Sequence, residues 1–238
     1  MEKYLDFLNR ISYQQAELLI GEGIFSPHKS LSDKVNVENS FRTFYGDTDV
    51  FDLDRQTKER ISALIEKLYE AVPECFCNKL DSHTLHMTLH DLSVFVKKEG
   101  AVSMTAENET KLIELLKDNP ISLQTIRMKT KFIINMLDIS LVLTLVTADE
   151  KEWDKLQKLY TLLDNVKICD YPFLTPHITL AYYNYNGFNA SSLAKLKGIV
   201  RDLNQQSFEI TLNTNKLFYQ HFTDMNHYET VFALTDNL

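Results

Sequence analysis

The same order of elements is predicted twice along this chain, and this duplication constrains the fold more than any other feature. Each half contains a strand, a helix, a second strand, a second helix and a third strand. The first copy comprises Phe41–Leu53, Arg55–Val72, 85–89, Thr105–Leu116 and Ile121–Ile134. The second comprises Ile139–Thr147, about Asp149–Leu163, 176–180, Asn189–Leu203 and Phe208–Tyr219, and a polar turn leads to a last strand at Tyr228–Leu234. Such a repeat predicts two lobes related by a pseudo-twofold axis.

The middle strand of each copy carries the same chemical motif. Residues 85–89 read LHMTL and residues 176–180 read PHITL, so a His and a Thr stand two positions apart in an apolar run. Because side chains alternate faces along a strand, His86 shares a face with Thr88, and His177 shares one with Thr179. If the lobes face each other, one imidazole can accept a proton while the other donates one. Cleavage of a phosphodiester without a metal requires this pair of proton transfers.

A His-x-Ser/Thr pattern is weak evidence by itself, and the chain contains four matches. The matches at His28 and His221 lie in or near turn-rich, polar segments, so we interpret them as surface residues. His86 and His177 differ because they occupy equivalent positions of the repeat. We therefore predict that this pair is functional.

The two motifs resemble the signature of the 2H phosphoesterase superfamily, a LigT-like group that includes RNA ligase-like cyclic phosphodiesterases and 2′,5′-phosphodiesterases. The resemblance covers about Asn39–Leu238 and includes the proline before the second motif. It implies a bilobal α+β fold in which two antiparallel sheets flank a central cleft, with helices outside. We expect lobe one at about 39–134, lobe two at about 135–238, and an N-terminal helix and loop over 1–38.

The resemblance also implies roles for the motif residues. His86 and His177 would be the catalytic general acid and base, acting through Nε2, and which residue plays which part stays open. Thr88 and Thr179 would donate hydrogen bonds to the non-bridging phosphate oxygens, where negative charge develops. No metal and no cofactor are expected.

Three further residues are candidates for substrate contact. His90 lies four residues after His86 and Tyr183 six after His177, so strict alternation places each on the face of its motif. Lys129 lies in a basic stripe with Arg127 and Lys131, which could guide phosphate at the cleft rim. The alternative for His90 is a surface histidine or one that supports the site without touching the substrate. For Tyr183 it is packing against a lobe, and for Lys129 it is a solvated strand face.

The remaining segments favour structural roles. Apolar spacing predicts a helix over Tyr4–Ile20, ended by Gly21 and Gly23, that packs on the body; dimerisation or a partner contact are the alternatives. The three cysteines, Cys75, Cys77 and Cys169, match no usual zinc spacing and are interpreted as reduced thiols.

The net charge and the distribution of apolar residues limit the kinds of binding partner that we expect. A formal net charge of −8 opposes binding to long DNA or RNA but is compatible with a small phosphate ligand. The sequence shows no membrane-spanning apolar stretch and no signal peptide, so we expect a cytoplasmic protein; its oligomeric state is not predicted.

The favoured hypothesis is a phosphoric diester hydrolase: a metal-independent phosphodiesterase or cyclic phosphodiesterase acting on a small nucleotide or an RNA end. Candidate substrates, by resemblance, are 2′,3′-cyclic phosphates, 2′,5′-linked oligoadenylates and cyclic dinucleotides. The alternative is a non-catalytic nucleotide-binding or regulatory module of the same fold. A structural or partner-binding protein with incidental histidines ranks last.

Overall fold

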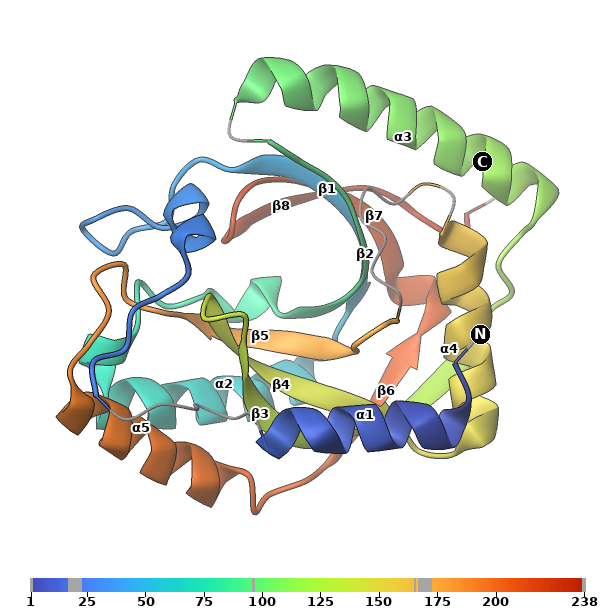
Figure 1. Cartoon of the computed structure of the whole chain (residues 1–238). Helices are drawn as coiled ribbons and strands as arrows, with labels where there is room; N and C mark the ends of the chain where they lie inside the picture. The colour runs from blue at the N-terminus through green and yellow to red at the C-terminus, as the bar shows by residue number, and fades with distance from the viewer. Residues whose placement is uncertain (1, 17–22, 96, 165, 167–172, 237–238) are drawn as a thin grey trace.

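Two four-stranded antiparallel sheets form the centre of the protein (Figure 1). The computed structural model describes residues 2–16, 23–95, 97–164, 166 and 173–236. The first sheet has the order β2-β1-β7-β8, with β1 at Tyr45–Asp52, β2 at His86–Phe95, β7 at Leu217–Asp224 and β8 at His227–Ala233. The second has the order β5-β4-β3-β6, with β3 at Thr125–Met136, β4 at Ser140–Thr147, β5 at His177–Tyr182 and β6 at Glu209–Asn213. The predicted α+β architecture is confirmed.

The two motif strands occupy equivalent places in the two sheets. β2 is the edge strand of the first sheet beside β1, and β5 is the edge strand of the second beside β4. The two edges are in contact with each other. The pseudo-twofold relationship expected from the repeat therefore brings both His-x-Thr segments to the line where the sheets meet.

The sheets do not follow the two halves of the sequence. β3 falls in the expected first lobe but pairs with β4 and β6, while β7 and β8 extend the first sheet beside β1. β3 and β4 pair because a tight turn with positive φ at Leu137 and Asp138 joins them as a hairpin, and consecutive strands joined in this way pair readily. The predicted lobes 39–134 and 135–238 therefore do not coincide with the sheets.

One predicted strand is wrong. Phe208–Tyr219 was expected to be continuous, but a short 3₁₀ turn at Thr214–Lys216 divides it into β6 and β7. These two strands belong to different sheets. The turn carries the chain from one sheet to the other, and the polar run 213–216 (NTNK) in the middle of the predicted strand marks its place.

Helices cover the outer faces of the sheets (Figure 1). Their bounds are Tyr4–Ala16 for α1, Arg55–Ala71 for α2, Lys98–Asp118 for α3, Glu150–Leu163 for α4 and Ala190–Leu203 for α5. Asp54, Asp149 and Asn189 cap the first turns of α2, α4 and α5 through their side-chain oxygens, as their residue types predict. α3 begins before the predicted Thr105 and packs on β1 and β2. No helix in the described ranges has the length and apolar character needed to cross a membrane.

Helix α1 packs on the body, as the favoured interpretation predicted. Phe7 and Ile11 are fully buried, and the Phe7 ring stacks on Trp153 of α4 with 3.9 Å between ring centroids. The Tyr4 hydroxyl donates to the carbonyl of Thr147 at the end of β4. Positions 17–20 of the predicted helix lie outside the described residues.

Candidate active site

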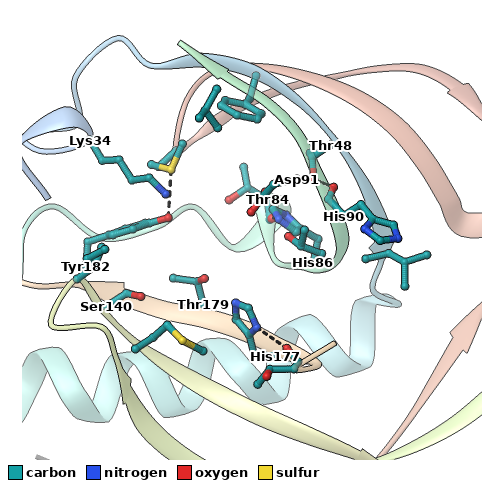
Figure 2. A pocket seen from close by; sticks show the side chains of 18 of the residues that line it. Lys34, Thr48, Thr84, His86, His90, Asp91, Ser140, His177, Thr179 and Tyr182 are labelled. Atoms are coloured by element: carbon teal, nitrogen blue, oxygen red, sulfur yellow. Dashed lines mark hydrogen bonds between the residues drawn. The ribbon is translucent and has the colours of Figure 1, made fainter. Parts of the chain in front are cut away.

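A cavity of about 340 Å³ lies where the two motif strands meet (Figure 2). His86 and Thr88 line it from β2, and His177 and Thr179 line it from β5. Figure 2 shows the two imidazoles on opposite walls, both directed into the space between the sheets. All four residues of the two motifs therefore share one cavity.

The two histidines have the same local anchor. His86 Nδ1 lies 2.6 Å from the carbonyl oxygen of Thr84, and His177 Nδ1 lies 2.8 Å from the carbonyl oxygen of Thr175. A carbonyl oxygen only accepts hydrogen bonds, so each Nδ1 must carry the proton that it donates. In each neutral ring the lone pair is then on Nε2, which leaves that nitrogen to exchange protons with a ligand.

Partial removal from water disfavours the protonated, charged form of both rings. The pKa of His86 is lowered from its ordinary value, first by desolvation and then by the positive charges of His177 and Lys58. The pKa of His177 is lowered by desolvation and by Lys34. The hydrogen bonds to the Thr84 and Thr175 carbonyls oppose this shift and raise the two pKa values, and the carboxylate of Asp91 raises both further.

A β-bulge follows each motif at the same position. Leu89 on β2 and Leu180 on β5, each three residues after its His, have no counterpart on the neighbouring strand. An extra residue reverses the alternation of faces beyond it. The fifth residue after each His therefore lines the cavity, and these residues are Asp91 and Tyr182.

The bulge after the second motif places Tyr183 outside the cavity, so the expectation for this residue fails, whereas His90 still lines the cavity. Tyr183 is fully buried away from the cavity, where its ring contacts Phe25 and Phe188 and its hydroxyl donates to Asn135. His90 is buried at the cavity wall and stacks on Tyr160 with 4.2 Å between centroids. Its Nε2 lies 2.8 Å from the Tyr160 carbonyl oxygen, and Figure 2 shows its ring directed away from His86.

Lys129 does not line the cavity. It lies on the exposed face of β3, with its ammonium 3.9 Å from Glu209. Arg127 of the same stripe pairs with Asp149 and Glu152. The basic stripe is thus a solvated strand face with local ion pairs.

Long-range contacts add residues that the sequence reasoning did not place in the site. Lys34 lines the cavity from the segment before β1, with its ammonium 5.3 Å from the Phe44 ring centroid and 5.4 Å from that of Tyr182. Tyr228 of β8 meets His86 edge-on, with 5.0 Å between centroids. A signal for the histidine anchors was present, because Thr84 and Thr175 extend the repeated motif to Thr-x-His-x-Thr-Leu.

The other His-x-Ser/Thr matches lie elsewhere. His28 caps a short 3₁₀ helix, Lys29–Asp33, and His221 contacts the hydroxyl of Tyr219. Cys75 and Cys77 are buried free thiols, and Cys169 lies outside the described residues. Within the described part of the chain, no group of three or more His, Cys, Asp or Glu side chains is arranged to hold a metal ion.

Comparisons with known proteins bear on the fold. The structure of a conserved protein of unknown function from Agrobacterium tumefaciens is similar over 88% of this chain and 94% of that chain, with a TM-score of 0.68 and 14% identity. E. coli LigT, in a structure with 3′-AMP, matches over 81% of this chain and 99% of that one, with a TM-score of 0.47 and 19% identity. A structure described as a phosphoesterase matches over 80% and 98%, with a TM-score of 0.47 and 20% identity. No family model and no curated protein matches the sequence.

At 14% identity, the likeness to the Agrobacterium protein concerns the fold alone. The architecture itself has the features expected of a 2H phosphoesterase-like protein: two antiparallel sheets, helices outside, and a His-x-Thr strand at the edge of each sheet. The fold expected from the two motifs is therefore confirmed.

Proposed function

We propose that this protein is a metal-independent phosphodiesterase or cyclic phosphodiesterase that acts on a small nucleotide or an RNA end. The observation that carries the proposal is the mirrored pair of imidazoles: each donates Nδ1–H to a backbone carbonyl, and both line one cavity. A binding site needs hydrogen-bond donors for phosphate, but it does not need two proton carriers held in the same tautomer on opposite walls.

In the proposed reaction, Nε2 of one histidine removes a proton from water or from a ribose hydroxyl, which attacks the phosphorus. Nε2 of the other histidine, protonated beforehand, gives its proton to the leaving oxygen, so the two rings exchange protonation states over one turnover. Thr88 and Thr179 donate hydrogen bonds to the non-bridging oxygens as charge develops there. Water or product exchange restores the starting state.

The character of the cavity supports a small nucleoside phosphate as substrate. About 340 Å³ is at the small end of the range for small-molecule sites. Aromatic side chains form one wall beside His86, where Phe44, Phe222 and Tyr228 lie in a row with centroid spacings of 6.0 and 5.7 Å. Rings of this kind can pack against a base or ribose.

A substrate panel tests the proposal. We expect wild-type protein to turn over at least one member of a set of 2′,3′-cyclic nucleotides, 2′,5′- and 3′,5′-linked dinucleotides, cyclic dinucleotides and RNA with a cyclic phosphate end. Activity should persist in excess chelator. Nucleotide binding without turnover would favour the regulatory module instead, and loss of rate in chelator would contradict the metal-independent mechanism.

The pH dependence should reflect the two half-buried imidazole rings. The active form has one neutral and one protonated imidazole, so kcat/KM should peak between the two pKa values. Because burial lowers both pKa values from the ordinary 6.5, we expect a bell-shaped profile with its maximum below about pH 6.5. Asp91→Asn removes a charge that raises both pKa values, so both limbs should move to lower pH. If neither limb of the profile moves in Asp91→Asn, the two limbs do not belong to His86 and His177.

Lys34 should strengthen substrate binding. Its ammonium lines the cavity of an acidic protein, where an anionic substrate loses part of its solvation. We expect Lys34→Ala to raise KM about tenfold with a smaller change in kcat. Lys29→Ala, at an exposed position of the adjacent 3₁₀ helix, is the matched control. Equal KM values for the two variants would exclude this role.

A further inference from the structure

A cationic side chain on a helix donates a hydrogen bond to the backbone just before each candidate catalytic histidine. The carbonyl oxygen three residues before His86 belongs to His83, and it accepts a hydrogen bond of 2.6 Å from Lys58 of α2. The carbonyl oxygen three residues before His177 belongs to Leu174, and it accepts one of 2.8 Å from Arg10 of α1. The two cations thus bind equivalent points of the repeated motif.

Each cation is itself held by a carboxylate. Lys58 lies 2.5 Å from Asp52 at the end of β1. Arg10 forms two parallel bonds with Glu2, of 2.8 and 2.9 Å, and the Glu2 side chain is 6% exposed. A bidentate pair of this kind fixes the plane of the guanidinium as well as its position.

Arg10 holds the second motif more firmly than Lys58 holds the first. Besides the Leu174 carbonyl, its other terminal nitrogen donates to the hydroxyl of Thr175 at 2.8 Å. Thr175 is the residue whose carbonyl accepts the proton on His177 Nδ1. Arg10 therefore restrains both the peptide group before Thr175 and its side chain, and with them the direction of the carbonyl that orients the ring.

We propose that Arg10 is a positioning residue for His177, through which the N-terminal helix becomes part of the active site, and that Lys58 has the equivalent role for His86. This inference rests on the proposed function. The cation that binds the first motif, Lys58, lies on α2, which is within the same repeat. The cation that binds the second motif, Arg10, lies on α1, which is outside the repeat. A misplacement of about 1 Å at a reacting group costs on the order of 10²-fold in rate, so such a restraint has a large effect on catalysis.

Arg10→Met tests the proposal with the packing retained. The methionine keeps an apolar stem beside the rings of Phe7 and Phe173, which the guanidinium carbon approaches to 5.8 and 5.5 Å, but it has no donors. We expect kcat to fall about 10- to 100-fold with little change in KM. Arg10→Lys, which can keep one of the donated bonds, should recover part of the rate. Tyr13→Ala, on the exposed side of the same helix, should behave as wild type.

Imidazole nitrogen resonances provide a readout that does not depend on turnover. In wild-type protein near neutral pH, both rings should show a protonated Nδ1 and an unprotonated Nε2. Arg10→Met should convert His177 to a mixture of tautomers and leave His86 unchanged, and Lys58→Met should do the reverse. A general loss of structure would disturb both rings together, so this crossed pattern separates positioning from folding.

The outcomes are distinct. Wild-type kcat and an unchanged His177 tautomer in Arg10→Met would overturn the inference, as would equal disturbance of both rings. A crossed tautomer pattern in a protein that turns over no phosphodiester would leave the positioning role intact and overturn the proposed function.

Discussion

Alanine at either position 86 or position 177 is expected to lower kcat/KM by about 10²- to 10⁴-fold on any phosphodiester that the wild type turns over. Each imidazole is held by a backbone carbonyl and lines the cavity, so alanine removes one of the two proposed proton carriers. Because the two rings act in one step, the double variant should lose little more than the worse single variant. His28→Ala, outside the cavity, is the control and should keep the wild-type rate.

The pH profiles of the single variants make this test sharper. If His86 and His177 are the acid and the base, each variant should lose one limb of the bell, and the limb that disappears identifies the role of the missing ring. Full activity in either variant, or a residual activity that keeps both limbs, would show that the titrating groups lie elsewhere.

Replacing a motif threonine by valine is expected to lower kcat by about 10²-fold, because a donor aimed at developing negative charge contributes on this scale. Thr88→Val and Thr179→Val preserve the shape of the side chain and remove only the hydroxyl. The corresponding serine variants keep the donor and should retain most of the rate. Thr110→Val, on the exposed face of α3, is a control for the substitution itself.

The balance between kcat and KM distinguishes two roles for these hydroxyls. A donor that acts mainly in the transition state should affect kcat, whereas a donor that only binds substrate should raise KM and leave kcat unchanged. Serine variants as slow as the valine variants would indicate that the methyl group, and so packing of the strand, accounts for the loss.

The placement of the His beside the Thr within each motif could be predicted from the sequence, because it depends only on local geometry. Alternation within three residues puts His86 beside Thr88 and His177 beside Thr179, and the repeat of element order makes the two segments equivalent. The anchoring of Nδ1 is also local, since the acceptor carbonyl lies only two residues before each His. Short-range geometry of this kind depends little on how the rest of the chain packs.

Alternation stops being predictive at the bulges. Whether Leu89 and Leu180 form part of a regular ladder depends on the register of β1 and β4, and those strands are distant in sequence. For this reason Tyr182 lines the cavity and Tyr183 does not, and Asp91 lines it in addition to His90. A distant partner also decides the sheet of β7, which pairs with β1, whereas β3 joins the second sheet through its hairpin with β4.

The sequence by itself determined which chemical groups occur in duplicate, on which kind of element and in what local geometry, because a strand imposes its two-residue period on any side chain. The tertiary structure alone decided what surrounds those groups. Arg10 binds Thr175, Lys34 lines the cavity and Tyr228 packs against His86, all through contacts that depend on the packing of the whole molecule. No periodicity along the chain encodes such contacts, since their cost in chain entropy is offset only by the complete fold.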